Sequence, residues 1–315
     1  MSFPFVPGHE VVGDRDDGSR VVLEAVLGCA ARGIDPPCDA CAVGDVGRCQ
    51  RIAFGDLEPG LQTGFCCDTG GGWSTALVAH PSQLHDVADD LTDEAAVMVE
   101  PTACAVRSAL AAGEGGVQVV LGAGTLGLLT IAALRHFGSP DTLIATARYP
   151  HQKRLATELG ADVVVDPDEA HRAVRRATGA MVIGDTLTRG AASVVDCVGS
   201  ADTIATGIDV VGAGGRVVLC GMPGTTTVDL TPLWQKEVAL VGAYAYGQES
   251  GAHAGRRTFD LAFELVGAAD LGRLVSATYP LDRYKEALEH AAAAGPRGSV
   301  KIAFDLRTER ERESL

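Results

Sequence analysis

A glycine-rich segment near the middle of the chain carries the clearest chemical signal. Gly122, Gly124 and Gly127 form a G-x-G-x-x-G pattern directly after the strand-like run VQVVL and before an apolar helical pattern. In such a strand–turn–helix unit, the first glycine permits the tight turn and the second lets the backbone approach a pyrophosphate. The third lets the helix pack closely on the strand. Because the helix amino terminus also offers free N–H groups to phosphate, we expect a dinucleotide site here.

The end of the next strand-like run indicates which dinucleotide is bound. An NAD site carries a carboxylate there, which accepts the ribose hydroxyls and repels a 2′-phosphate. This sequence has Ala147 at that place, followed by Arg148 and Tyr149, with Lys153 one turn further on. A guanidinium pairs with phosphate through its planar fork. The pattern therefore favours NADP(H) over NAD(H), and the alternative is that Arg148 is only a solvated surface residue.

Three cysteines at short spacing indicate a structural metal site. Cys38, Cys41 and Cys49 lie in a segment rich in Gly, Pro and Asp. A structural zinc ion takes four S or N ligands in a tetrahedron, so a fourth ligand is required. Cys29 is the nearest candidate, ahead of Asp35, because a thiolate suits a sulfur-rich zinc site better than a carboxylate. The alternative is that these are thiols without a metal.

Two further segments offer ligands for a second metal site. Gly8-His9-Glu10 lies near the start of the sequence, and Glu100-Pro101 lies just before the glycine-rich segment. One histidine and one or two carboxylates can hold zinc while leaving a coordination position open for water or substrate. The alternative is that His9 and Glu10 are ordinary surface polar residues.

The elements that must position these residues fall into two patterns. The sequence pattern of residues 1–104 predicts short strands separated by turns, for example the strands VVLEAV (21–26) and STALVA (74–79). From there to residue 246, apolar β-branched strands alternate with helices, which predicts a doubly wound parallel sheet. After that point, helices at 259–268 and 284–294 precede a closing strand at 300–306. We therefore expect a catalytic domain of residues 1–104 and 247–315, and a dinucleotide-binding domain of residues 105–246.

Composition excludes several other classes of function. The 315 residues carry a formal net charge of −15 without a dense basic run, which argues against binding to nucleic acid or an anionic membrane. The sequence shows no spanning apolar stretch and its first residues do not resemble a signal peptide. Nine cysteines in such a chain favour thiols or metal ligands in the cytoplasm over a disulfide framework.

Taken in order, these motifs resemble the zinc-dependent medium-chain dehydrogenase/reductase (alcohol dehydrogenase) family, especially its polyol, sugar and threonine dehydrogenases. The resemblance covers nearly the whole chain. It rests on an ordered set of motifs: Pro7–Gly13, Gly18–Val21, the Cys38/Cys41/Cys49 segment, Gly71–Ser74, Glu100–Ala103, Gly122–Gly127, Leu159–Asp162 and Asp196–Gly199.

The resemblance implies a fold and a set of residue roles. It implies a Rossmann sheet joined to a mainly β, GroES-like catalytic domain, and an enzyme that transfers a hydride between NADP(H) and an alcohol, aldehyde or ketone, with homodimers or homotetramers as assemblies. His9 and Glu100 would be ligands of the catalytic zinc, with Glu10 a direct or exchangeable ligand. Trp73 would line the substrate cleft, and Thr125 and Leu126 would lie behind the nicotinamide.

Two departures from the family pattern keep other functions open. The family carries a further amino-terminal segment with a catalytic zinc cysteine and a proton-relay hydroxyl, so we expect this chain to be amino-terminally shortened. Asp35 stands where the first cysteine of the structural site is usual. A reductase of the same fold without a catalytic metal, and a cofactor-binding protein without activity, are therefore the alternatives.

Overall fold

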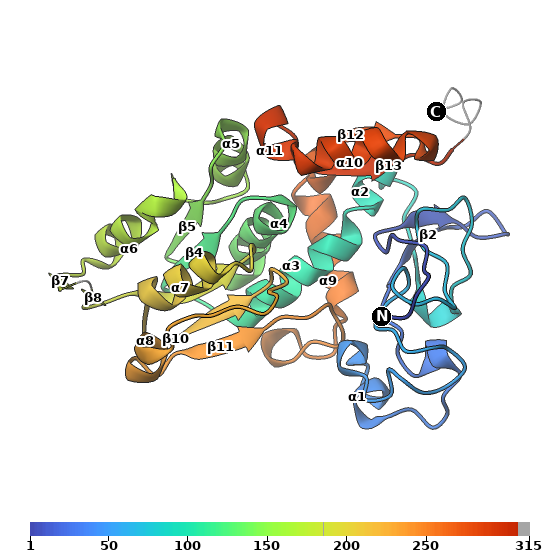
Figure 1. Ribbon diagram of the computed structural model, residues 1–315, viewed down its shortest axis with the longest axis horizontal. Coiled ribbons are helices and arrows are strands. Elements are labelled where there is room, and N and C mark those ends of the chain that lie inside the picture. Colours follow the sequence, from blue (N-terminus) through green and yellow to red (C-terminus); the bar gives the residue numbers. More distant parts are fainter. Residues whose placement is uncertain (185, 308–315) are drawn as a thin grey trace. The chain divides into compact units, whose positions relative to one another are not determined.

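The computed structural model describes residues 1–184 and 186–307 (Figure 1). The chain divides into two compact units, which we call the first unit (Met1–Ala103 and Ala245–Leu315) and the second unit (Cys104–Tyr244). Residues 308–315 of the predicted catalytic domain lie outside the described residues. The assignment of catalysis to the first unit and of dinucleotide binding to the second stays a prediction.

The second unit is built around a six-stranded sheet in the order β11-β10-β9-β4-β5-β6, in which every neighbouring pair is parallel. Its strands are β4 (Val117–Leu121), β5 (Thr142–Thr146), β6 (Val163–Val165), β9 (Ala191–Asp196), β10 (Val211–Leu219) and β11 (Ala239–Gly242). A small antiparallel hairpin is made by β7 (Val182–Ile183) and β8 (Thr186–Leu187). The predicted doubly wound parallel sheet is confirmed.

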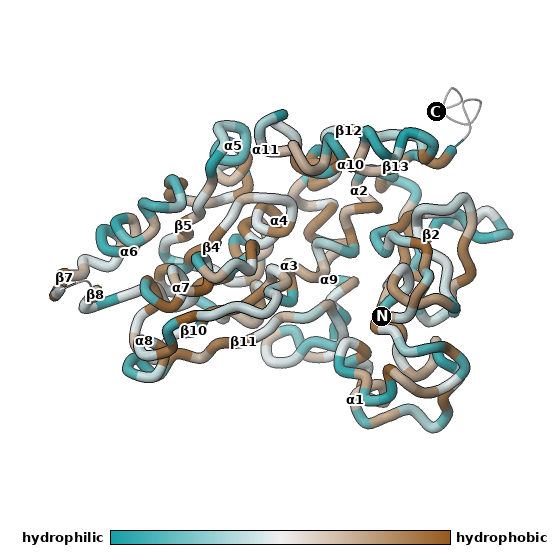
Figure 2. The backbone as a smooth tube through the Cα atoms, in the orientation of Figure 1, coloured by the Kyte–Doolittle hydropathy of each residue, from teal (hydrophilic) through white to brown (hydrophobic). Residues whose placement is uncertain are grey.

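Helices follow the strands of this sheet in turn. They are α4 (Thr125–Ala133), its π-helical continuation η4 (Leu134–Gly138), α5 (Pro150–Glu158), the 3-10 turn η5 (Pro167–Glu169), α6 (Ala170–Thr178), α7 (Ala201–Val210) and α8 (Thr231–Gln235). Every α4 residue from Gly127 to Ala133 is buried, which matches its apolar sequence. In contrast, α5 and α6 are hydrophilic over much of their length (Figure 2), because each buries only one side.

The strand order has a consequence for ligand binding. Connections from β4 lead to β5 and β6 on one side, whereas β9, β10 and β11 lie on the other side. The order therefore changes direction between β4 and β9. In open parallel sheets, ligands bind at the carboxyl ends of the strands at such a switch point. The turn from Gly122 to Gly127 follows β4 directly.

The first unit contains two small sheets with helices between them in sequence. Strands β1 (Val12–Asp14), β2 (Arg20–Leu23) and β3 (Leu84–Asp86) form an antiparallel sheet, and β12 (Val275–Tyr279) and β13 (Lys301–Phe304) form a parallel pair. The helices are α1 (Asp39–Ala42), α2 (Asp93–Ala96), α9 (Thr258–Ala268), α10 (Tyr284–Ala292) and α11 (Ala294–Arg297). Short 3-10 turns complete it: η1 (Ala30–Arg32), η2 (Val46–Arg48), η3 (Pro81–Gln83), η6 (Gly251–His253), η7 (Leu271–Leu274) and η8 (Leu281–Arg283).

Helix α3 (Val99–Ala112) begins in the first unit and continues into the second. The predicted helices at 259–268 and 284–294 correspond to α9, α10 and the start of α11. Within the described residues, no helix has the length and apolar character needed to cross a bilayer.

The strand expected at 74–79 is wrong. The Ser74 hydroxyl donates hydrogen bonds to the carbonyl groups of Gly71 and Ala76, which closes a bend, and the side chain of Val78 is 88% exposed. An apolar residue favours a strand only where its side chain can pack against a neighbouring strand and a hydrophobic core. The run expected at 21–26 is also shorter, because β2 ends at Leu23 and Val26 makes only an isolated bridge to Gln62.

Candidate functional site

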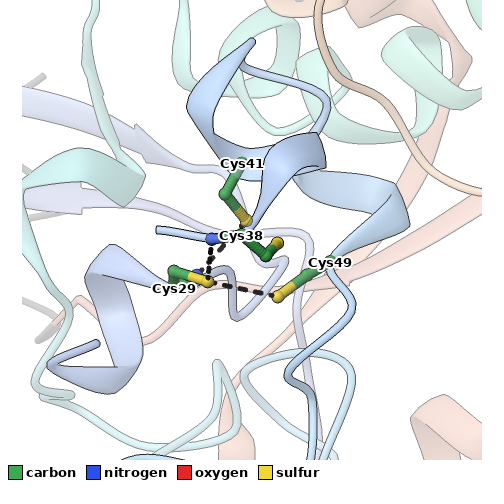
Figure 3. A group of neighbouring side chains, drawn as sticks. All are labelled: Cys29, Cys38, Cys41 and Cys49. Atoms are coloured by element: carbon green, nitrogen blue, oxygen red, sulfur yellow. Dashed lines mark hydrogen bonds between the residues drawn. The ribbon is translucent and has the colours of Figure 1, made fainter. Parts of the chain in front are cut away.

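Four cysteines of the first unit converge on one point (Figure 3). Their sulfur atoms all lie within 4.8 Å of one another, and the residues are Cys29, Cys38, Cys41 and Cys49. Cys38 precedes α1, Cys41 lies within it, and Cys49 follows the turn η2, so short local elements set three of the positions. The exposed residue Asp35 is not among them. The structure therefore brings together the four thiols that the sequence ranked first.

Backbone N–H groups point at each of these sulfur atoms. The N–H of Cys29 donates to the sulfur of Cys41 and the N–H of Cys38 to the sulfur of Cys29, each at 3.4 Å. The N–H of Gln50 donates to the sulfur of Cys38 at 3.5 Å, and the N–H of Arg51 donates to the sulfur of Cys49 at 3.4 Å. Burial alone would raise the pKa of the Cys38 thiol, but hydrogen bonds from Gln50 and Cys41 lower it to about 6. Such donors stabilise thiolates, the form that binds a metal. The donor set and its hydrogen bonds fit a tetrahedral zinc ion.

His9 and Glu10 are positioned by a close contact between two glycine-containing segments. The backbone N–H groups of Gly72 and Trp73 donate to the carbonyl groups of Gly8 and Pro7, at 2.8 and 2.9 Å. Gly8 has a φ of +99°, and a Cβ atom there would lie 2.7 Å from Cδ1 of Trp73. A glycine is therefore required directly before His9. Trp73 itself packs edge-on against Phe304, with ring centroids 5.0 Å apart.

Glu100 lies in the first turn of α3 and is only 2% exposed. Burial and the neighbouring carboxylate of Glu10 raise the pKa of Glu100 to about 8, although a hydrogen bond from Tyr246 and the charge of Lys301 act in the opposite direction. Its Oε1 atom is buried and has no hydrogen-bond partner. A buried carboxyl oxygen without a partner is costly, so this atom is suited to a cation.

Glu10 is held by a residue from the far end of the chain. Its carboxylate forms an ion pair with the ammonium group of Lys301 in β13. Burial lowers the pKa of the His9 imidazole, which favours the neutral form that can bind a metal. Among the described residues, the four cysteines are the one group whose ligand atoms meet within 4.8 Å, so His9, Glu10 and Glu100 are near one another without forming a closed ligand set.

The glycine-rich turn of the second unit has the geometry that its sequence implies. Gly122 has a φ of +89° and donates its N–H to Oγ1 of Thr146 at 3.0 Å. A Cβ atom on Gly127 would lie 1.7 Å from the carbonyl oxygen of Gly122, so only glycine fits there. Gly124 is the N-cap of α4, and nothing lies within 4 Å of the place a Cβ atom would take. Thr125 and Leu126 open the helix. The turn thus presents exposed backbone at a helix amino terminus, which suits a phosphate group.

The residues after β5 that the sequence assigns to the cofactor differ in their exposure and in their interaction partners. Ala147 is buried and donates its N–H to Val165, whereas Arg148 is exposed. Tyr149 stacks on His151 with ring centroids 5.9 Å apart. Lys153 is already paired with Asp166, at 2.9 Å between Nζ and Oδ2. Arg148 is therefore better placed than Lys153 to receive an additional phosphate.

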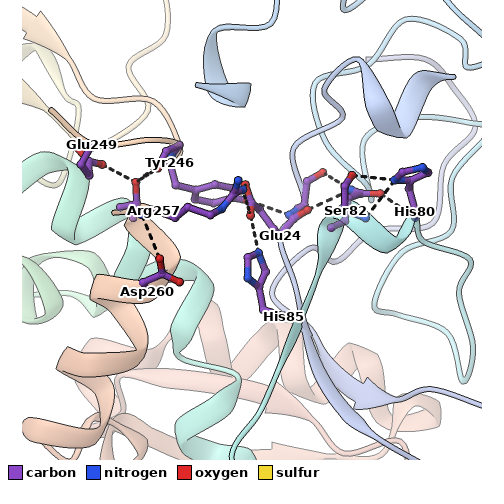
Figure 4. A network of polar contacts seen from close by, with 12 residues as sticks. Glu24, His80, Ser82, His85, Tyr246, Glu249, Arg257 and Asp260 are labelled. Carbon is purple, nitrogen blue, oxygen red and sulfur yellow. Dashed lines mark hydrogen bonds and ion pairs between the residues drawn. The ribbon is translucent and has the colours of Figure 1, made fainter. Parts of the chain in front are cut away.

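A partly buried network that the sequence did not indicate connects three segments of the first unit (Figure 4). Glu24, which follows β2 and is 2% exposed, accepts hydrogen bonds from Arg257 at 2.6 Å and binds Nε2 of His85 at 2.6 Å. The hydroxyl of Tyr246 accepts the N–H of Ala25 at 2.8 Å. Tyr246 also hydrogen-bonds to Glu100, so the network extends to the Glu100 carboxyl.

Comparison with known proteins gives a consistent set of relatives. The family described as zinc-binding dehydrogenase matches residues 125–258. L-idonate 5-dehydrogenase from Vitis vinifera is 28% identical, and sorbitol dehydrogenase from Arabidopsis thaliana is 27% identical. Each alignment covers 96% of this chain and 80% of the relative.

Solved structures agree with these relatives. A structure from Sinorhizobium meliloti 1021, assigned to the zinc-binding dehydrogenases and bound to NADP, has a TM-score of 0.73 at 25% identity and covers 96% of this chain and 84% of its own. The 2R,3R-butanediol dehydrogenase from Bacillus subtilis has a TM-score of 0.72 at 21% identity, with coverage of 98% and 82%, and supports the fold alone.

Proposed function

Because this chain belongs to the zinc-dependent medium-chain alcohol dehydrogenase family and is an oxidoreductase, we propose that it transfers a hydride between NADP(H) and a small polyol or related alcohol. The first unit would be the GroES-like catalytic domain and the second unit the dinucleotide-binding domain. The relatives L-idonate 5-dehydrogenase and sorbitol dehydrogenase support a substrate of the polyol class. A cytoplasmic homodimer or homotetramer is part of the proposal.

The observation that carries the proposal is the buried carboxyl of Glu100. Its unpartnered Oε1 atom lies near His9 and Glu10, and nitrogen and oxygen donors of this kind bind catalytic zinc. His9 and Glu100 would hold the ion, and Glu10 would join them after release from Lys301. A bound zinc ion would polarise the alcohol oxygen and lower the pKa of its hydroxyl group. The four cysteines would hold a second, structural zinc.

The residues of the second unit would bind and orient the cofactor. Gly122, Gly124 and Gly127 would receive the pyrophosphate at the start of α4, with Thr125 and Leu126 behind the nicotinamide ring. Ala147, Arg148 and Tyr149 would surround the adenosine ribose, with Arg148 on a 2′-phosphate and Lys153 in a supporting position. Trp73 would contact the substrate.

The test is oxidation of a panel of polyols and simple alcohols, followed through the absorbance of the reduced cofactor, with zinc content measured on the same sample. We expect polyol-dependent reduction of NADP⁺ and two zinc ions per chain. His9→Ala and Glu100→Gln should each lower kcat/KM by at least ~100-fold and remove one zinc ion, because both remove a ligand. The matched control is Glu94→Gln, which alters an exposed carboxylate six residues before Glu100.

A second candidate is a reductase of the same fold that uses the nicotinamide without a catalytic metal. The ion pair between Glu10 and Lys301 favours it, because a carboxylate with its own ammonium partner has no need of zinc. One zinc ion per chain together with undiminished activity in Glu100→Gln would establish this candidate instead.

A further inference from the structure

Two cysteines outside the metal sites follow neighbouring strands of the second unit. Asp196, the last residue of β9, is paired with Leu219, the last residue of β10, so Cys197 and Cys220 are the first residues after these two strands. The Cys220 N–H also donates to the carbonyl oxygen of Asp196 at 3.0 Å. Adjacent strands are about 4.8 Å apart. That spacing falls inside the range of roughly 4.4–6.8 Å between Cα atoms that a disulfide bond accepts.

The side chains of this pair interact and are surrounded by hydroxyl groups. The interaction between the two thiol groups lowers the pKa of Cys220 and raises that of Cys197. The hydroxyl groups of Ser108 from α3 and Thr130 from α4, both fully buried, also lower the pKa of Cys220, and the Ser108 hydroxyl donates to the carbonyl oxygen of Cys104 at 2.8 Å. The Cys197 thiol donates to Oγ1 of Thr130 at 3.5 Å. Donors of this kind favour a thiolate, which is the reactive form of cysteine.

We propose that Cys197 and Cys220 form a peroxide-sensitive pair that closes to a disulfide. The Cys220 sulfur attacks hydrogen peroxide, so that an S–O bond forms, the O–O bond breaks, and one water molecule leaves. The Cys197 sulfur then attacks the resulting sulfenic acid, so that the S–S bond forms, the S–O bond breaks, and a second water leaves. Two thiols and one peroxide thus give one disulfide and two waters. A dithiol reductant reverses the change by exchange.

The position of the pair connects its redox state to the glycine-rich turn. A Cβ atom on Gly127 would lie 3.7 Å from Cβ of Cys197, and one on Gly122 would lie 2.4 Å from Cγ2 of Val198. The Asp196 carboxylate accepts the N–H groups of Val198 and Gly199, at 2.9 and 3.1 Å, and so fixes the segment 197–199. An S–S bond of about 2.05 Å brings the two sulfur atoms well inside their contact distance. The segment 197–199 must then shift against the turn, and dinucleotide binding should weaken, a consequence that rests on the proposed function.

The first experiment tests the disulfide alone. The reduced, zinc-loaded full chain is treated with one equivalent of hydrogen peroxide, alkylated, digested without reductant and mapped by mass spectrometry. We expect one linked peptide that joins Cys197 to Cys220, absent from Cys197→Ser and Cys220→Ser. It should be retained in Cys67→Ser, which alters a thiol of the first unit with an acidic neighbour, Asp68. If wild type shows no such peptide, or if peroxide links only the cysteines of the metal site, the proposal is overturned.

The second experiment tests the effect on cofactor binding. NADPH is titrated against reduced and oxidised wild type and against Cys220→Ser treated in the same way. Oxidation should weaken NADPH binding to wild type on the order of tenfold, a usual size for coupled sites, and should leave the variant unchanged. Equal affinity of reduced and oxidised wild type would refute the connection to the turn. If the reduced protein binds no dinucleotide, the proposed function fails, whereas peptide mapping still decides on the disulfide.

Discussion

The sulfur atoms of Cys29 and Cys49 lie 3.8 Å apart although the two residues are 20 positions apart in the sequence. Cys29 comes before the short turn η1, and Cys49 follows η2. The backbone N–H of Cys38 donates to the Cys29 sulfur, which ties Cys29 to the other three cysteines. Asp35 is exposed and lies outside this group. The arrangement therefore favours an all-thiolate zinc site over one with a carboxylate ligand.

Replacing Cys29 with Ser should remove the structural zinc. Because metal binding contributes directly to folding of such segments, we expect the loss of one zinc per chain and a fall in Tm on the order of 10 °C. Metal analysis and calorimetry provide the measurement. Asp35→Asn is the matched control and should leave both values unchanged. If Asp35→Asn loses the zinc and Cys29→Ser keeps it, the ligand assignment is wrong.

Arg148 should decide the preference for NADPH. A charge-assisted bond to phosphate contributes on the order of 1.5–3 kcal/mol, so Arg148→Ala should weaken NADPH binding by roughly 10- to 150-fold and leave NADH nearly unchanged. Lys153→Ala should have a smaller effect, because Lys153 is already paired with Asp166. The measurement is titration of both reduced cofactors. The prediction fails if the native chain prefers NADH, or if Arg148→Ala weakens both cofactors equally.

What could be predicted from the sequence depends on how local the determining contacts are. The turn from Gly122 to Gly127 and the strands around it follow from short patterns, and Gly127 is required by the carbonyl oxygen of Gly122 five positions earlier. The same holds for Cys38, Cys41 and Cys49. The pairing of Glu10 with Lys301 joins residues 291 positions apart, and nothing near Lys301 distinguishes it from an ordinary strand lysine. The segment 74–79 has a strand-like composition, but which segments pair in a sheet is set by distant neighbours.

Lys301 should compete with a metal ion for the carboxylate of Glu10. Lys301→Met removes the ammonium partner and leaves the Glu10 carboxylate, whose charge raises the pKa of Glu100, without a cation. We expect the metal-free protein to lose on the order of 1–3 kcal/mol of its free energy of unfolding, because a half-buried charge loses its partner. Zinc should bind more tightly to the same variant. Urea unfolding of the metal-free protein and zinc titration measure the two effects, and weaker zinc binding in Lys301→Met would contradict this role.

The ionised carboxylate of Asp162 should stabilise the second unit, and this stabilisation should be lost in acid. Burial by itself acts to raise the pKa of Asp162, but hydrogen bonds from the Leu143 N–H and from Arg135, each 2.7 Å long, and the charge of Arg135 lower it overall. A carboxylate whose pKa is lower in the folded than in the unfolded chain contributes stability that is fully present above the unfolded value, about 3.9. This contribution is lost as the pH falls through the folded pKa.

The size of this effect is limited by solvent, because the Asp162 side chain is 45% exposed. We expect Asp162→Asn to lower the free energy of unfolding at neutral pH by about 0.5–1 kcal/mol, mainly through the weaker bonds to Leu143 and Arg135. The difference between native chain and variant should shrink toward zero as the pH falls below the folded pKa, since both side chains are then neutral. Urea unfolding from neutral pH down to the lowest pH at which the chain stays folded measures this trend. A difference that is constant over the whole range would show that the charge of Asp162 plays no part.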